Sequence, residues 1–185
     1  MREIQLDSEE GLLKRLQIGA TIGTIVATIC LPILIHLIPF EGSIPLGAIL
    51  LPVFYAPLFA VYKYKYHVAI ITSVIAPWLN HLITGFPAKP LLSVITIELF
   101  VFTLILIFLR NQKGIRWFAG PLVYIITKTI SGSLIYLFPA ILEGGIPLNY
   151  GINSISNATP GILVLLGINI LVVKMNGNTG QNQSK

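Results

Sequence analysis

Hydrophobic residues are arranged along this chain in six long apolar segments, separated by turns rich in glycine, proline and polar residues. The six segments cover residues 16–38, 44–61, 67–83, 91–109, 117–141 and 155–173. A membrane-spanning helix needs about 20 apolar residues, within a range of about 17 to 25, so the second and third segments are short for a span. The pattern predicts an all-α membrane protein, a single bundle of six transmembrane helices.

Composition agrees with this class and divides the chain into three parts. Only 10 % of the 185 residues are charged, whereas a soluble domain would have roughly a quarter. We expect a cytoplasmic amphipathic N-terminus at 1–15, the six-helix membrane domain at 16–173 and a disordered polar tail at 174–185. The longest separator, 143–154, is a candidate lid.

The basic residues predict the orientation of the bundle. With six spans both termini lie on one side, and ten of the 12 lysine and arginine residues fall on that side. The opposite side has only Lys89, and Lys128 lies inside a predicted helix. Because cytoplasmic loops are enriched in these residues, both termini are predicted to be cytoplasmic. The net charge of +5 is scattered over short loops and indicates membrane topology, not a nucleic-acid partner.

Two formal charges, Glu98 and Lys128, lie deep inside predicted helices. A charge at mid-membrane costs between about 3 and over 10 kcal/mol. At a rise of about 1.5 Å per residue, Glu98 is about 10 Å and Lys128 about 16 Å from the outer ends of their helices, within reach of a lysine side chain. The two residues therefore either form a structural ion pair or contact a polar ligand. The polar run at 127–133 favours a wet cavity.

Further polar side chains converge on the outer half of the bundle, as Glu98 does. Trp78, Asn80 and His81 end the third predicted helix, and Asn153 and Asn157 open the sixth. A tryptophan there is usually an interfacial anchor, a lone histidine is more often a core residue than a ligand, and one asparagine is expected to cap its helix. Their convergence nevertheless makes Asn80, His81 and Asn157 candidates for binding a solute.

The first helix carries a stripe of small residues at spacing four, Gly19, Gly23 and Ala27. Such a stripe lets another helix approach closely. It serves either packing inside this bundle or docking of a separate membrane protein.

The usual signatures of catalysis and metal binding are missing from the sequence. It has no G-x-x-x-x-G-K-[ST] loop, no G-x-S-x-G elbow and no H-E-x-x-H spacing among its three histidines. We therefore expect no cofactor or metal, and these absences leave a membrane-embedded enzyme open as an alternative.

Two segments rich in proline resemble the substrate-binding S components of energy-coupling factor (ECF) transporters. They read Leu-Pro-Val-Phe-Tyr-Ala-Pro-Leu at 51–58 and Ala-Pro-Trp-Leu-Asn-His-Leu-Ile-Thr-Gly-Phe-Pro at 76–87. Glu98 after a loop with proline, the segment from Lys128 to Gly132, and Thr-Pro-Gly-Ile-Leu at 159–163 add to the resemblance. The order and spacing of these features carry it over nearly the whole chain.

The resemblance implies an ABC importer that brings a vitamin or related micronutrient across the plasma membrane of a prokaryote. This chain would capture the solute in a pocket in its outer half, under its first, third and fifth loops. Lys128 would suit a carboxylate or phosphate, and Trp78 or Tyr55 could stack on a ring.

The resemblance also implies partner proteins. Gly19, Gly23 and Ala27 stand where the family usually has alanines at spacing four, and that stripe docks a transmembrane coupling protein. ATP hydrolysis would come from two separate ATPase subunits, and the chain itself would catalyse no reaction.

Two other functions fit a chain of this size and topology. A structural membrane protein of the rod-shape-determining type would recruit partners without a solute site, so it would not need Glu98 and Lys128 in a cavity. A small membrane-embedded enzyme would show turnover without any ATPase partner.

The orientation gives a first testable prediction. A cysteine placed at Lys113, in a chain whose Cys30 is replaced by serine, should resist an impermeant thiol reagent in intact cells, because residue 113 is predicted to be cytoplasmic. A cysteine at Lys89 is the matched control and should be labelled. Labelling at 113 in intact cells would overturn the topology.

Overall fold

The structure, a computed structural model, describes residues 2–137 and 149–181. The described residues are mostly helical and contain no β-strand. Five helices are long and apolar enough to cross a membrane: Arg15–His36, Tyr66–Thr84, Leu91–Leu109, Ala119–Leu137 and Thr159–Asn176. The protein is therefore an all-α membrane protein with multiple spans.

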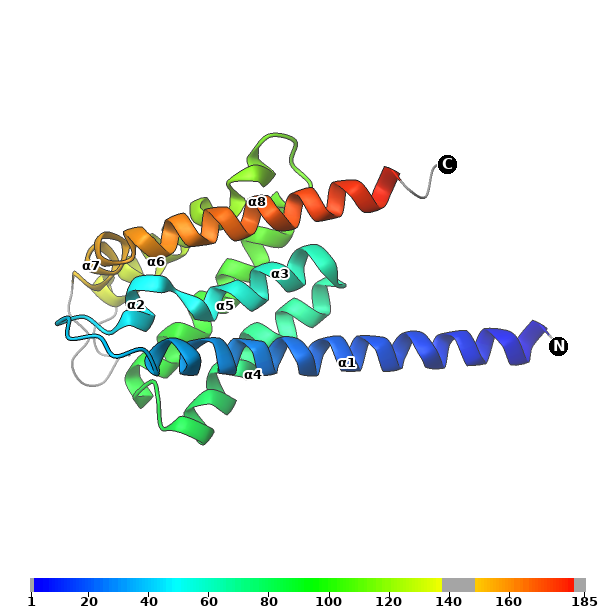
Figure 1. Ribbon diagram of the computed structural model, residues 1–185, viewed down its shortest axis with the longest axis horizontal. Coiled ribbons are helices and arrows are strands. Elements are labelled where there is room, and N and C mark those ends of the chain that lie inside the picture. Colours follow the sequence, from blue (N-terminus) through cyan, green and yellow to red (C-terminus); the bar gives the residue numbers. More distant parts are fainter. Residues whose placement is uncertain (1, 138–148, 182–185) are drawn as a thin grey trace.

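The long helices run along the molecule, and two of the short helices lie at one end. The long ones are α1 (Arg2–His36), α4 (Tyr66–Thr84), α5 (Lys89–Leu109), α6 (Ala119–Leu137) and α8 (Thr159–Gln181). Figure 1 shows α1 and α8 running in opposite directions, so that the start of α1 and the end of α8 lie at the same end. The short helices α2 (Leu46–Leu50) and α7 (Tyr150–Asn157) lie at the other end. By the distribution of basic residues, that second end is predicted to be the outer one.

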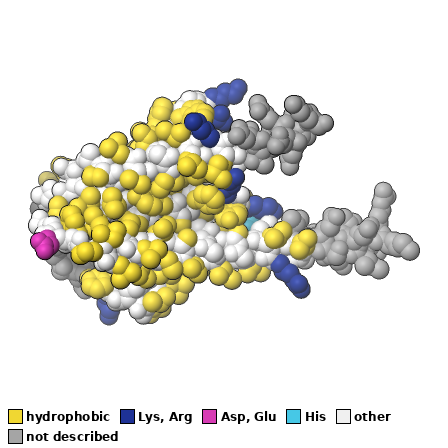
Figure 2. Space-filling view, viewed as in Figure 1, with side chains coloured by type: hydrophobic (Ala, Val, Ile, Leu, Met, Phe, Trp, Pro, Cys, Tyr) yellow, Lys and Arg dark blue, Asp and Glu magenta, His cyan; other side chains and the backbone are white. Residues whose placement is uncertain are grey.

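The flank of the molecule is apolar. Figure 2 shows hydrophobic side chains over its length, with most lysine and arginine side chains gathered toward the end where α1 begins. Large apolar side chains are well exposed, among them Leu82 at 77 % and Phe108 at 71 %. A water-soluble protein rarely exposes so much contiguous apolar surface, whereas lipid covers it without cost.

The second predicted helix, residues 44–61, is not continuous. It is divided into α2, a short 3₁₀ helix η1 (Pro52–Phe54) and α3 (Tyr55–Lys63). Pro52 disfavours the α conformation of Leu51 and supplies no backbone N–H, so α2 ends there. Leu51 itself adopts a left-handed conformation at φ 60°. The prediction of an unbroken helix is wrong here, and the described part of the chain has five helices of spanning length, not six.

Other boundaries also differ from the sequence pattern. The predicted helix 155–173 is divided between α7 and α8, and α8 continues past Val173 to Gln181. The candidate lid, 143–154, has residues 143–148 outside the described part, and residues 150–154 belong to α7. The N-terminal residues from Arg2 belong to the same continuous helix as the first span. Residues 138–141 of the predicted fifth helix lie outside the described residues.

The core forms where the broken segment meets the long helices. Phe54 packs edge-on against Phe102 of α5 and Tyr124 of α6, with ring centroids 5.0 and 5.2 Å apart. Leu58 of α3 and Leu165 of α8 are fully buried in the same cluster. The break in the chain therefore places α3 in the centre of the bundle, where it contacts α1, α4, α5 and α8.

Asn169 of α8 connects that helix to the start of α6. Its side chain is fully buried. Its Oδ1 accepts from the backbone N–H of Gly120 at 3.2 Å, and its Nδ2 donates to the carbonyls of Arg116 and Trp117 at 2.8 and 2.7 Å. One amide thus pairs the N–H of Gly120 in the first turn of α6 and the carbonyl of Trp117, and it shares the carbonyl of Arg116 with the hydroxyl of Tyr62.

Asn169→Leu should lower the free energy of unfolding by at least about 2 kcal/mol, because each buried polar group left unpaired costs about 1–3 kcal/mol. Asn176→Leu, on the same helix but exposed, is the matched control. Denaturant unfolding in one detergent measures both variants. Equal effects of the two substitutions would contradict the role assigned to Asn169.

Candidate functional site

Glu98 and Lys128 form a buried ion pair. Glu98 Oε2 and Lys128 Nζ are 2.7 Å apart. Glu98 is 1 % exposed and Lys128 6 % exposed. The residues come from α5 and α6, which pack against each other. The structure therefore pairs the two charges that the sequence placed inside the membrane.

Neighbouring side chains complete the hydrogen bonding of the pair. Ser131 Oγ donates to Glu98 Oε1 at 2.7 Å, so both carboxylate oxygens have a donor. Ser131 follows Lys128 by three residues, which places both on one face of α6. Lys128 Nζ also donates to Tyr150 Oη of α7 at 2.9 Å. These bonds stabilise a pair that would otherwise be costly to desolvate.

Two glycines bring Tyr150 to this position. A Cβ built on Gly151 would lie 2.8 Å from the carbonyl oxygen of Lys128 and 3.1 Å from Gly132 Cα. Only glycine fits such a close approach of α7 to α6. Burial raises the pKa of the Tyr150 phenol well above its ordinary value, and the Glu98 carboxylate raises it further. Tyr150 therefore remains neutral and accepts the lysine hydrogen bond through its oxygen.

The ion pair lies at the wall of a cavity of about 620 Å³. This volume falls within the range of about 300–1,000 Å³ that is usual for small-molecule sites. The wall is formed by α1, α2, η1, α4, α5, α6, α7 and the loop before α5. Most lining residues are apolar: Pro32, Ile44, Pro45, Ala48, Leu51, Pro52, Val53, Phe54, Ala76, Pro77, Phe86, Pro87, Ala88, Leu91 and Ile95. The polar lining residues are Thr28, His36, Asn80, Glu98, Tyr124, Lys128, Tyr150, Asn153, Ser154 and Asn157.

The C-terminal end of α4 holds the loop that borders this cavity. Gly85 ends the helix at φ 75°. Asn80 Nδ2 donates to the carbonyl of Phe86 at 2.9 Å, and His81 Nδ1 donates to that of Pro87 at 2.8 Å. Asn80 Oδ1 has no hydrogen-bond partner among the described residues. His81 therefore shapes the loop, whereas Asn80 both shapes it and lines the cavity.

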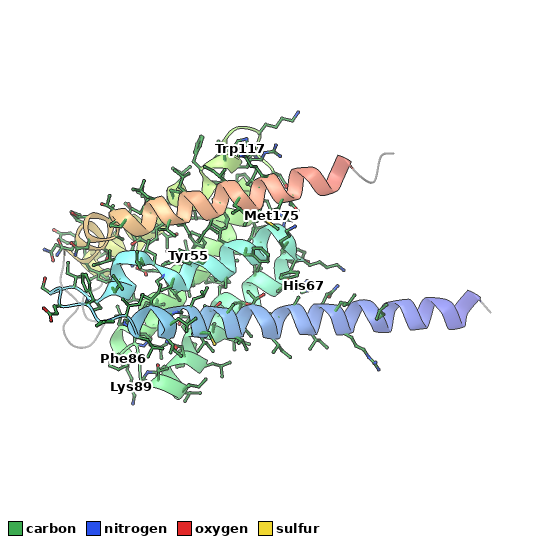
Figure 3. All side chains as sticks on the ribbon, in the orientation of Figure 1. Tyr55, His67, Phe86, Lys89, Trp117 and Met175 are labelled. Atoms are coloured by element: carbon green, nitrogen blue, oxygen red, sulfur yellow. The ribbon has the colours of Figure 1, made fainter. Side chains whose placement is uncertain are left out.

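The structure separates the predicted site residues into two groups. Glu98, Lys128, Asn80 and Asn157 line the cavity. The other three do not. Trp78 is 50 % exposed on the flank, His81 holds the loop, and the hydroxyl of Tyr55 donates to the carbonyl of Leu50 beside the break in the second segment. Figure 3 shows Tyr55 amid the central helices and Phe86 toward the outer end.

Sequence reasoning missed several residues of the site. Ser131 could have been found, because it lies one turn from Lys128 on a predicted helix. Tyr150 had a weaker signal, its position beside Gly151 in a separator. Phe54 and Tyr124 are aromatic residues in apolar segments and carry no signal that distinguishes a cavity wall from a core.

The glycines of α1 face away from the bundle. Gly19 and Gly23 are exposed, and a Cβ built on either would meet no atom of the described chain within 4 Å outside its own helix. Ala27 is half-buried. The inward face carries Thr24 and Thr28, whose hydroxyls donate to backbone carbonyls of α1. Packing inside this chain is therefore not the role of the two glycines.

The arrangement is suited to binding. The described residues contain no group of three or more His, Cys, Asp and Glu side chains that could hold a metal. Both charges of the site are engaged with each other.

Comparison of the chain with family models, with curated proteins and with solved structures finds no match.

The pair gives a prediction on stability. Lys128→Met should lower the free energy of unfolding by about 3–5 kcal/mol, because it leaves a buried carboxylate uncompensated. Adding Glu98→Leu should restore most of that loss. Lys89→Met, at an exposed position on α5, is the matched control and should have little effect. Unfolding of the wild type, Glu98→Leu, Lys128→Met, the double variant and Lys89→Met in one detergent measures the coupling. Additive losses in the double variant would contradict a direct pair.

Proposed function

We propose that this chain is the membrane-embedded substrate-binding (S) component of an ECF-type ABC importer in the plasma membrane of a prokaryote. It captures a vitamin or related micronutrient on the outer side and delivers it by associating with a transmembrane coupling protein and two ATPase subunits. The observation that carries this proposal is the cavity of about 620 Å³ beside the Glu98–Lys128 pair. The sequence resemblance to S components agrees with it.

The position of the cavity supports capture from outside. Its lining includes α2, α7 and the loop before α5, which lie at the end opposite the start of α1 and the end of α8. With both termini in the cytoplasm, this end faces outward. A structural membrane protein would not need a cavity of ligand size with buried charges in its wall.

The surface of α1 supports docking of a coupling protein. In its apolar stretch only 17 % of the residues are buried, against 28 % to 39 % in the four other spans. Gly19 and Gly23 lie on this free surface, where the lack of side chains lets a second helix approach its backbone closely. The same helix lines the cavity through Thr28 and Pro32 on its inward side.

Replacing Gly23 with leucine should abolish the complex with the coupling protein and ATPases, because the larger side chain blocks the close helix approach. It should leave small-molecule binding by the isolated chain intact, since Gly23 contacts no other helix of this chain. The tagged chain is purified from its native membranes, and mass spectrometry identifies both the proteins and the small molecules that accompany it.

Gly167→Leu is the matched control, because Gly167 of α8 is also exposed and free of contacts from other helices. It should retain both the complex and the small molecule. Loss of both in Gly23→Leu would mean that the glycine stabilises the chain itself. A wild-type chain that brings down neither ATPase subunits nor a coupling protein would refute the proposed function.

A further inference from the structure

The formal charges in the cavity wall cancel each other. Glu98 and Lys128 are the only Asp, Glu, Lys or Arg residues among its described lining residues. They are 2.7 Å apart and almost fully buried. Any solute in the cavity therefore meets a wall with no net charge from these groups, and both charged side chains are themselves buried from solvent.

An anionic solute would compete with a carboxylate that is already in place. Lys128 Nζ can donate three hydrogen bonds, and two are given to Glu98 and Tyr150. A carboxylate or phosphate bound to the third donor would lie close to Glu98 and be repelled by it. A cation that approached Glu98 would in turn be repelled by Lys128, and both carboxylate oxygens already have donors. Either ion would lose its hydration without gaining an unpaired counter-charge.

The rest of the wall favours a neutral molecule with hydrogen-bonding groups. Asn80, Asn153, Asn157 and Ser154 supply amides and a hydroxyl. Asn80 Oδ1 is buried without a partner in the described structure, while Nδ2 is held by the carbonyl of Phe86. That oxygen can accept from an N–H or O–H group, and the free donor of Lys128 can give to a carbonyl or hydroxyl oxygen. The apolar majority of the wall would contact the body of the molecule.

We infer that the solute carries no net charge at neutral pH and binds through neutral hydrogen-bonding groups on a largely apolar body. This inference rests on the proposed function and adds the chemical class of the substrate. It differs from the expectation, drawn from the sequence alone, that Lys128 suits a carboxylate or phosphate. The reason is that Glu98 already supplies the anion that Lys128 requires.

The charge of the bound molecule is the first readout. The full chain is purified in detergent, and small molecules are released by denaturation, separated on anion and cation exchangers at pH 7 and identified by mass spectrometry. We expect the molecule that is enriched over a mock purification in the fraction retained by neither exchanger.

Matched pairs of probes provide the second readout. Biotinamide with biotin, pantothenol with pantothenate and nicotinamide with nicotinate each share a carbon framework and differ in one anionic group. In calorimetry, the neutral member of any pair that binds should have a dissociation constant at least tenfold lower than its anionic partner.

A substitution in the pair should reverse this preference. Glu98→Gln keeps the size of the side chain and an oxygen that accepts from Lys128, but leaves the ammonium uncompensated. The variant should bind the anionic member at least tenfold more tightly than the wild type does. Glu41→Gln, at an exposed position outside the cavity, makes the same chemical change and should leave the preference as it is.

The outcomes separate this inference from the proposed function. If the bound molecule has a net charge, or if the wild type prefers the anionic probe, the inference of a neutral solute is wrong. The proposed function then stands, with a charged solute as the substrate. Absence of any bound molecule together with no heat from any probe overturns solute binding, and the inference falls with it. If Glu98→Gln fails to fold, the wild-type measurements still decide.

Discussion

The buried ion pair between Glu98 and Lys128 is the interaction around which the cavity end of the bundle is arranged. Neither charge could remain in the interior alone, because an unpaired buried ion costs several kcal/mol. The pair therefore holds α5 against α6 at one register. Ser131 supports the carboxylate and Tyr150 supports the ammonium, and the second of these contacts extends the network to α7. The close packing of Gly132 and Gly151 makes that extension possible.

The irregular backbone of the chain lies where the cavity is. Within a bilayer, non-helical backbone is tolerated only when it is buried in protein or lines a cavity. Leu51, Pro52 and Phe54 mark the break between α2 and α3, and all three line the cavity. The loop at Phe86 and Pro87 borders it as well, held by side chains from the last turn of α4. The proline-rich segments thus form the site, and the regular helices beneath them form the core.

The proposed importer subunit uses two surfaces of one helix. The inward side of α1 lines the cavity through Thr28 and Pro32, while Gly19 and Gly23 lie on its outward side. Solute and coupling protein would therefore contact opposite faces of the same element. The proposed neutral solute agrees with this arrangement, because a buried pair whose charges cancel would leave hydrogen bonds as the means of recognition.

The sequence by itself determined the membrane class, the apolar segments that form the long helices and the two residues that had to be paired or solvated, because hydrophobic periodicity and the cost of buried charge act locally. It predicted six spanning helices, whereas the described residues contain five of spanning length. It also suggested Asn80 and Asn157 as site residues, because polar side chains at the ends of predicted helices converge on the same half of the bundle. It could not decide whether Gly19 and Gly23 face inward, since a small-residue stripe looks the same in either role. It also could not show that Lys128 is neutralised by Glu98, that Tyr150 completes the network or that Leu51 breaks the second segment. These depend on contacts between residues distant in the chain, and only the tertiary structure brings those residues together.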